Sequence, residues 1–169
     1  MLHRGLGETH VTTPPDIAIR WHDAPREERR ELFVLAEDSR EALDGYLRLG
    51  RVLVAVEGEA RVGHAQLVEP GASGEIELRS LAVAEDRQRR GIGRALVERV
   101  VAEARAGGAH TLLVATAAAD IGNLRFYQRL GFRMLRVERD AFTPSEGYPE
   151  GLLIDGIPLR DRVWLTLSL

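Results

Sequence analysis

The chain has 169 residues, 44% hydrophobic and 29% charged, which is usual for one globular domain with its own core. The formal net charge of −3 argues against nucleic acid as the main partner, because nucleic-acid binding usually needs a basic face. The absence of cysteine excludes disulfides, thiolate metal sites and a covalent acyl-cysteine intermediate. No apolar run approaches the length of a membrane span and the start lacks a signal-peptide core, so we expect a cytoplasmic protein without membrane contacts.

The N-terminal third predicts a tail, a strand and two helices. Residues 1–15 are polar and predict a flexible tail, followed by one domain over residues 16–169. Alternation predicts a first strand over Asp16–Trp21, and apolar residues at helical spacing predict a helix from Ala24 to about Asp38. Ser39 is the expected N-cap of a second helix that extends to Leu49.

The middle of the chain alternates between strands and a helix. The apolar runs Arg51–Val56 and Arg61–Val68, separated by a polar turn, predict a hairpin. Glu75–Val83 is the next predicted strand, and Gly91–Ala106 a helix ended by two glycines. Thr111–Thr116 is apolar throughout, which is typical of a central strand.

The C-terminal third predicts a last helix and two closing strands. The helix covers Asp120–Leu130, and the strands cover Phe132–Arg139 and Arg162–Leu169. Between the strands lies a long segment, Asp140–Asp161, with Asp155-Gly156 as its expected tight turn. The order of elements therefore predicts one mixed α/β domain.

A phosphate-binding loop is the most informative feature. The segment Val83–Leu96 predicts a strand, a polar turn, and a helix opened by Gly91 and Gly93. Unpaired N–H groups at a helix start attract phosphate, and glycine lets the phosphate approach the backbone. Neighbouring arginines, Arg89, Arg90 and Arg94, add positive charge.

Other common phosphate and catalytic motifs are missing. Leu96 stands where a dinucleotide-binding loop has its third glycine, and a P-loop needs a lysine, which the chain lacks. No Gly-x-Ser-x-Gly motif is present, which argues against a serine hydrolase. The five histidines have no metal-ligand spacing, so we expect no metal site.

A second motif lies about thirty residues further on, in the segment Asn123–Phe132. Asn123 and Tyr127 are one helical turn apart and share a face of the predicted helix. We expect Phe126 to be the core residue, which leaves Tyr127 on the adjoining face with Asn123.

The pattern Gln88-x-x-Gly91-x-Gly93, followed by Asn123 and Phe126-Tyr127-x-x-Leu-Gly-Phe, resembles the GNAT superfamily of acetyl-CoA-dependent N-acetyltransferases. The resemblance covers Ile17 to Arg139. It implies a mixed, mostly antiparallel sheet, splayed in the middle, with helices on both faces and the coenzyme wedged into the splay. The implied coenzyme-binding residues are Leu81, Ala82, Val83, Gln88, Arg89, Arg90, Gly91, Ile92, Gly93, Arg94, Asn123 and Tyr127.

The resemblance also implies catalytic roles. Tyr127 would contact the coenzyme sulfur and protonate the departing thiolate, Asn123 would bind the pantetheine arm, and the backbone of Leu81–Val83 would pair with that arm like an added strand. In some members a glutamate at the position of Glu77 is the general base. One alternative is that Asn123 caps its helix with Asp120. Another is that Glu77 belongs to a solvated strand face shared with Glu75, Arg79 and Leu81.

The acceptor is the least determined part of the function. The segment Asp140–Asp161 is acidic and contains Phe142 and Tyr148. The strand ends on either side of it should place it beside the acceptor entrance, opposite the first two helices. An acidic rim favours a small cationic amine as the acceptor. Because the chain has no cysteine, we expect this amine to attack the thioester directly in a ternary complex. The alternatives are a non-catalytic acyl-CoA sensor and an acetyltransferase acting on a protein N-terminus or another macromolecule; a homodimer also stays open.

Overall fold

The computed structural model describes residues 14, 16–23, 30–34, 36, 39–69, 71 and 74–169. The expected N-terminal tail, apart from residue 14, lies outside the described residues. The helix predicted over 24–38 is described only in part, because residues 24–29, 35, 37 and 38 also lie outside the described residues.

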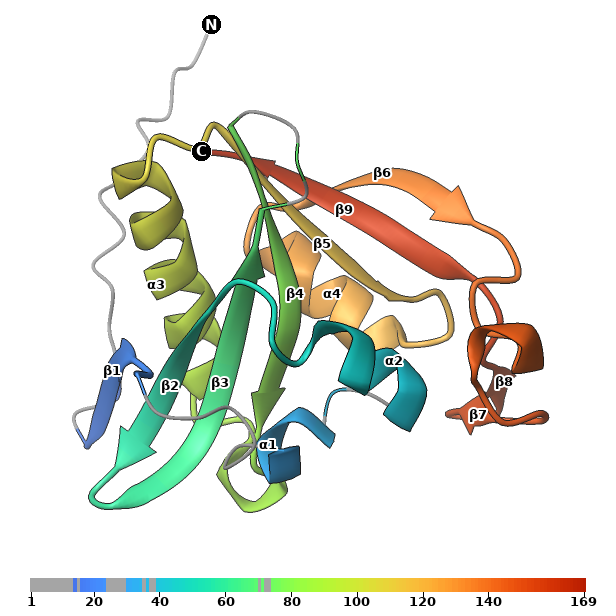
Figure 1. Ribbon diagram of the computed structural model, residues 1–169, viewed down its shortest axis with the longest axis horizontal. Coiled ribbons are helices and arrows are strands. Elements are labelled where there is room, and N and C mark those ends of the chain that lie inside the picture. The colour runs from blue at the N-terminus through green and yellow to red at the C-terminus, as the bar shows by residue number, and fades with distance from the viewer. Residues whose placement is uncertain are drawn as a thin grey trace, which may run out of the picture.

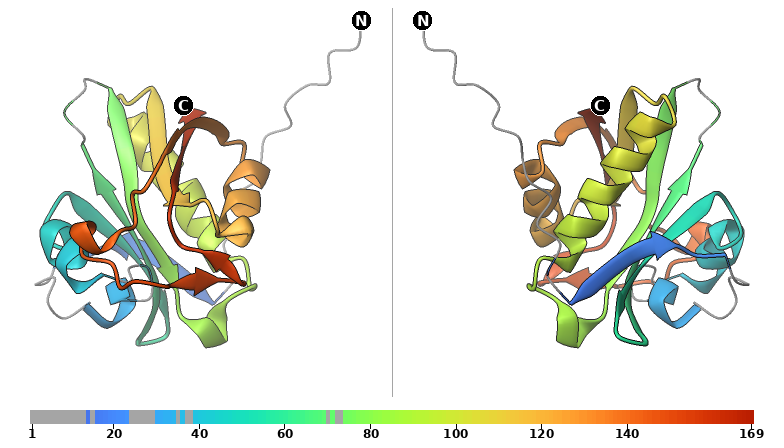
Figure 2. Two further views of the ribbon diagram at one scale, coloured as in Figure 1. Left: turned by 90° about the vertical axis from the view of Figure 1, so that its right-hand side faces the viewer. Right: turned by 90° about the vertical axis from the view of Figure 1, so that its left-hand side faces the viewer.

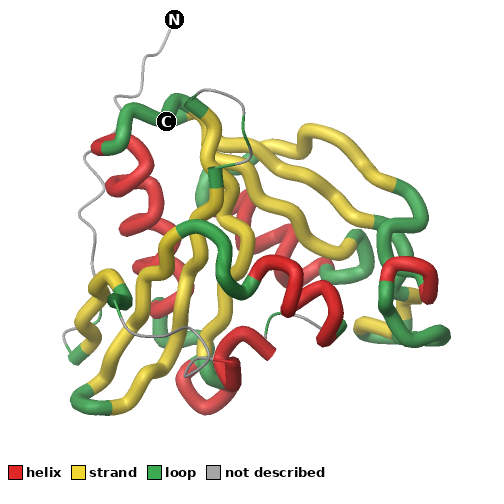
Figure 3. The backbone as a smooth tube through the Cα atoms, viewed as in Figure 1, coloured by secondary structure: helices red, strands yellow, loops and turns green. Residues whose placement is uncertain are grey.

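The fold is organised around a seven-stranded sheet with the order β1-β2-β3-β4-β5-β9-β6 (Figures 1 and 3). All neighbouring strands are antiparallel except β4 and β5, which confirms the predicted mixed, mostly antiparallel α/β fold. The strands are β1 (Ile17–Trp21), β2 (Arg51–Glu57), β3 (Ala60–Val68), β4 (Glu75–Val83), β5 (Thr111–Ala117), β6 (Arg133–Glu138) and β9 (Arg162–Ser168).

Helices cover both faces of this sheet. The short helices α1 (Arg30–Val34) and α2 (Arg40–Tyr46) lie on one face, and α3 (Ile92–Ala106) and α4 (Ile121–Arg129) lie on the other (Figure 2). The Ser39 hydroxyl caps α2 by accepting the N–H of Ala42 at 3.1 Å, as predicted, but the helix ends at Tyr46 rather than Leu49.

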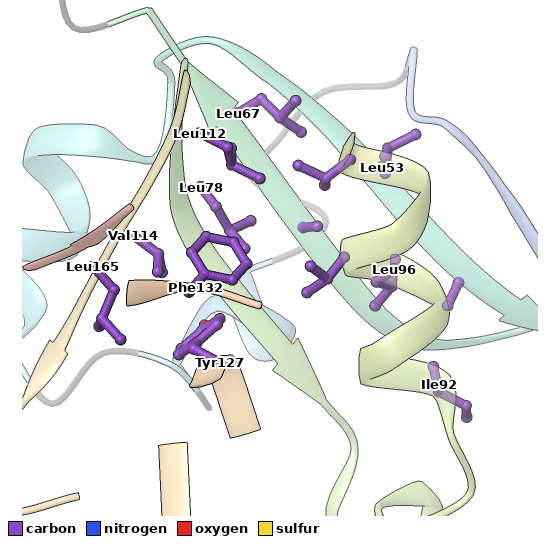
Figure 4. Close-up of a cluster of buried hydrophobic side chains, with 14 of the residues drawn as sticks. Leu53, Leu67, Leu78, Ile92, Leu96, Leu112, Val114, Tyr127, Phe132 and Leu165 are labelled. Carbon is purple, nitrogen blue, oxygen red and sulfur yellow. The ribbon is translucent and has the colours of Figure 1, made fainter. Parts of the chain in front are cut away.

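Two apolar cores hold these layers together. The larger core lies between the sheet and the α3–α4 layer, and Figure 4 shows side chains from the strands and from both helices meeting there. The smaller core joins Phe33 of α1 and Leu43 of α2 to the outer face of β2. β2 contributes apolar side chains to both cores. A one-residue slip would move each of its side chains to the opposite face, so the packing of the two cores fixes its register.

The sheet opens in its middle. β4 and β5 pair only where Glu75–Leu78 lies beside Thr111–Val114. Beyond these residues the two strands diverge, as Figure 1 shows. On its other edge, β4 contains a bulge: Ser80 pairs with Gln66 and Leu78 with Leu67, which leaves Arg79 as the extra residue.

The bulge corrects the expectation that Glu77 shares a face with Leu81. Leu78 belongs to the larger core and Leu81 packs against the same core, although the two are three positions apart. Glu77, the neighbour of Leu78, therefore faces the α1–α2 side.

A small hairpin follows β6. Its strands β7 (Leu153–Ile154) and β8 (Ile157–Pro158) are joined by Asp155 and Gly156, which both have positive φ angles. Two residues with positive φ are characteristic of the tight hairpin turn that the sequence predicts there.

Candidate active site

The loop before α3 has an unusual backbone. Arg89 and Gly91 have φ angles of 60° and 84°, and Gly91 is the N-cap of α3. Left-handed residues between right-handed or extended ones turn successive N–H groups toward one concavity, which is a common arrangement for binding anions. Gly91 is therefore needed for its backbone conformation as well as for the space that it leaves.

A cavity of about 560 Å³ lies over this loop, and we call it the loop cavity. Its wall combines the end of β4, the loop and start of α3, and the start of α4. The lining residues are Leu81, Ala82, Val83, Arg87, Gln88, Arg89, Gly91, Ile92, Gly93, Arg94, Asp120, Asn123 and Phe126. These include every coenzyme-binding residue expected from the sequence except Arg90 and Tyr127.

Arg90 lies outside the lining of the loop cavity, and its side chain binds the β2–β3 hairpin together with that of Arg87. Its guanidinium donates to Glu57 Oε1 at 2.7 Å, while Arg87 donates through Nε to Glu57 Oε2 at 2.6 Å. The hydrogen bonds from Arg87 and then Arg90 hold the pKa of Glu57 below its ordinary value. Of the two arginines, the sequence pointed to Arg90, whereas it is Arg87 that lines the cavity.

The start of α4 presents polar groups to the loop cavity. Asp120 is the N-cap, and its Oδ1 accepts the backbone N–H of Asn123 at 2.7 Å. Its Oδ2 accepts from the Asn123 side-chain amide, also at 2.7 Å. The capping pair weighed as an alternative is therefore present, and the same two residues line the cavity.

Tyr127 lies in the larger core, only 5% exposed, while Phe126 is half-buried, which reverses the predicted roles (Figure 4). The Tyr127 ring meets Phe126 and Phe132 edge to face, with centroids 5.1 and 5.5 Å apart. Burial, and next the nearby Asp120 carboxylate, raises the pKa of Tyr127 above its ordinary value. The hydroxyl therefore stays protonated at neutral pH and remains a hydrogen-bond donor.

Tyr127 lines a second cavity of about 170 Å³, which we call the central cavity. It occupies the opening between β4 and β5. Leu81, Asp120 and Asn123 line both cavities. The other lining residues are Ala36, Tyr46, Glu77, Leu78, Arg79, Ser80, Val114, Ala115, Thr116, Ala117, Phe142, Tyr148, Ile154, Leu159 and Arg162.

Glu77 reaches the central cavity from β4 and is 9% exposed. Its Oε1 accepts from Arg79 at 3.2 Å, which is the neighbour pair considered in the sequence. The Arg79 guanidinium in turn lies over the Tyr46 ring, 4.9 Å from the centroid. The carboxylate is therefore neither fully solvated nor without a counter-charge.

The segment between β6 and β9 forms the far wall of the central cavity. Phe142 and Tyr148 pack edge to face at 4.9 Å, and Gly147 lies against Ser39 and Glu41, beside α2 as expected. Acidic side chains of the segment, however, do not form the wall: Asp140, Glu146, Glu150, Asp155 and Asp161 are all outside the lining. Asp140 instead pairs with Arg160.

The comparison with known proteins rests on the same segments. The sequence model described as the Acetyltransferase (GNAT) family matches residues 14–132, which include the loop before α3 and helix α4. The chain belongs to the GNAT family of acetyltransferases.

Relatives extend this result over most of the chain. The uncharacterized N-acetyltransferase YvbK of Bacillus subtilis is 31% identical over 90% of this chain and 97% of its own length. A crystal structure of a GNAT family acetyltransferase from Elizabethkingia anophelis with acetyl-CoA bound matches with a TM-score of 0.84 and 31% identity, covering 92% of this chain and 99% of that one. The ribosomal protein bS18-alanine N-acetyltransferase of Salmonella typhimurium is 30% identical over 47% of this chain and 54% of its own length.

This acetyltransferase is thus an acyl-CoA-dependent enzyme. Within the part of the chain that the structure describes, no group of three or more His, Asp or Glu side chains is arranged to hold a metal ion. In the same part, no helix is long and apolar enough to cross a membrane.

The charge of Arg89 can be tested through coenzyme binding. Arg89 is exposed at the rim of the loop cavity, so Arg89→Ala should weaken acetyl-CoA binding by only about two- to fivefold. The difference in affinity between the variant and the unmodified enzyme should become smaller as the salt concentration rises, because salt screens the attraction between Arg89 and the coenzyme in the unmodified enzyme. Calorimetry at two salt concentrations measures both effects. Arg90→Ala is the matched control and should bind normally; an equal loss in both variants would contradict a specific role for Arg89.

Proposed function

We propose that this acetyltransferase moves the acetyl group of acetyl-CoA directly to the primary amine of a small molecule, within a ternary complex. The observation that carries the proposal is the junction of the two cavities at Leu81, Asp120 and Asn123. A coenzyme with its pyrophosphate at the loop before α3 would present its thioester to the central cavity through this junction. Direct transfer is favoured because the chain has no cysteine to carry an acyl group.

The pantetheine arm would lie along β4. Beyond Leu78, β4 is no longer paired with β5, which leaves backbone groups of Leu81–Val83 unpaired with that strand. The Val83 carbonyl accepts from Gln88 Nε2 at 3.2 Å. An extended arm could pair there as an added strand does. A backbone N–H in the same stretch would stabilise the oxyanion that forms as the amine attacks the thioester.

Two side chains would move the protons. Glu77 would accept a proton from the ammonium group of the acceptor, directly or through water, so that the free amine can attack. It is the more buried carboxylate of the cavity lining. Tyr127, kept protonated by burial, would donate to the departing thiolate.

The acceptor would be small and would arrive as an ammonium cation. A volume of about 170 Å³ is well below the roughly 300–1,000 Å³ of pockets that hold drug-sized ligands. A macromolecular acceptor, as in the name of the ribosomal relative, would have to enter beneath the segment containing Phe142 and Tyr148.

Glu77→Gln tests the proton acceptor. We expect kcat/KM at neutral pH to fall about 10²-fold, as is typical when a general base is removed. The deficit should narrow as the pH rises toward the pKa of the amine, near 10, because the free amine then needs no base. A thiol-release assay with acetyl-CoA and a panel of amines measures this.

Glu75→Gln is the matched control, because Glu75 lies on the same strand outside the lining of the central cavity. If the Glu77→Gln enzyme were as active as the unmodified enzyme at every pH, Glu77 would have only a structural role. Tight acetyl-CoA binding without acetylation of any small amine, peptide N-terminus or ribosomal protein would favour a non-catalytic sensor.

A further inference from the structure

The charges of the central cavity balance. Among its described lining residues, those charged at neutral pH are Glu77, Asp120, Arg79 and Arg162. A wall with two carboxylates and two guanidinium groups has no net charge. Such a wall offers little to a polyamine, whose additional ammonium groups would meet the two arginines.

Arg162 is a cation at the far wall that the sequence did not single out. It begins β9, and its side chain is only 21% exposed. Its guanidinium lies over the Phe142 ring, 5.0 Å from the centroid, and one N–H group reaches Glu138 Oε2 at 3.3 Å. Trp164 Nε1 donates to the same Glu138 oxygen at 2.9 Å, so Arg162 shares that carboxylate. A guanidinium has five N–H donors, so most of the N–H groups of Arg162 can still donate to a ligand.

Arg79 is held in a similar way on the opposite side. As the bulged residue of β4, it lies over the Tyr46 ring and gives one N–H group to Glu77. Stacking on an aromatic ring fixes the plane of a guanidinium, which lowers the entropy lost when it binds a planar carboxylate through two hydrogen bonds.

We infer that the acceptor carries a carboxylate as well as its amine, so that it is an amino acid or a similar small zwitterion. This inference rests on the proposed function and names the substrate class of the same site. The ammonium would lie toward Glu77 and the junction with the loop cavity, while the carboxylate would bind Arg162, with Arg79 completing the positive side. A phosphate is less suited, because its second negative charge would meet Glu77 and Asp120 without compensation.

Matched amines test the inference without changing the enzyme. Leucine and phenylalanine are each compared with their amide and with the decarboxylated amine, and aminoethyl phosphate is added as the phosphate counterpart. We expect kcat/KM to be about 10- to 100-fold higher for the amino acids than for the forms without a carboxylate. This is the gain in affinity that hydrogen bonds to a charged group typically provide.

Variants then locate the effect. Arg162→Gln should raise KM for the amino acids, so that their kcat/KM exceeds that of the amides by less than about threefold. Calorimetry measures the affinity for acetyl-CoA separately. Arg136→Gln is the matched control: Arg136 also stacks on an aromatic ring, Trp164 at 4.7 Å, but lies outside the central cavity. It should keep the full preference.

The outcomes separate the two proposals. Acetylation of amides and simple amines as efficiently as amino acids would overturn the carboxylate assignment and leave direct acetyl transfer in place. Preference for the phosphate compound, or an equal loss of preference in both arginine variants, would also overturn it. If none of these amines were acetylated, the small-amine function and this inference would both be wrong.

Discussion

Replacing Tyr127 with phenylalanine should leave acetyl-CoA binding nearly unchanged and lower kcat by about 10²–10⁴-fold, the usual effect of removing a general acid. The ring would keep its edge-to-face contacts with Phe126 and Phe132, so only the donor is lost. Because burial raises the pKa of Tyr127 above 10, the unmodified enzyme should not lose activity through this group between about pH 7 and 9.

Rapid-quench measurement of a single turnover is the decisive assay, since it separates acetyl transfer from product release. Calorimetry with acetyl-CoA and a thermal unfolding curve serve as controls for binding and folding. A normal single-turnover rate in Tyr127→Phe would mean that Tyr127 acts only in packing, as its place in the larger core allows.

Gly93→Val should reduce acetyl-CoA affinity at least 100-fold. Gly93 lies in the first turn of α3 and lines the loop cavity, where an added Cβ would meet Phe126 and Val83 at the ordinary distances of 3.6 and 3.7 Å. The helix should therefore tolerate the Cβ, while the branched side chain would fill the approach of the pyrophosphate to the backbone. Gly91→Val should abolish binding too, but its φ of 84° adds backbone strain.

Gly45→Val is the matched control, because Gly45 is also helical and an added Cβ there meets nothing within 4 Å. Valine is no worse than glycine inside a helix, so this variant should fold and bind acetyl-CoA normally. Calorimetry on the folded proteins measures the difference. Unchanged affinity in Gly93→Val would contradict the phosphate-binding role of this loop.

The sequence by itself determined the features that depend on neighbours in the chain. A serine before a helical pattern predicts the cap of α2, and Asp155-Gly156 predicts the hairpin turn, because cap and turn chemistry involve only a few adjacent residues. Gly91 and Gly93 mark the loop before α3 for the same reason. The order of these elements, together with the resemblance, was enough to predict the fold.

The tertiary structure decided which way side chains face. The extra residue Arg79 in β4 places Glu77 and Leu81 on opposite faces, and no periodicity in β4 itself reveals this, because the bulge is defined by pairing with β3. The sequence led us to expect Phe126 rather than Tyr127 as the core residue of helix α4. Contact with Phe132 and the strands determines that Tyr127 is the buried one.

The charges of the site were also decided by contacts distant in sequence. Glu57, in the β2–β3 hairpin, binds Arg90 outside the loop cavity. Arg162 comes to the central cavity only because β9 lies between β5 and β6, whereas the acidic residues of the segment before it lie outside the cavity lining. Local spacing fixes the helix start that binds phosphate, whereas the acceptor side is assembled from strands, a bulge and a long connection whose proximity arises only when the sheet forms.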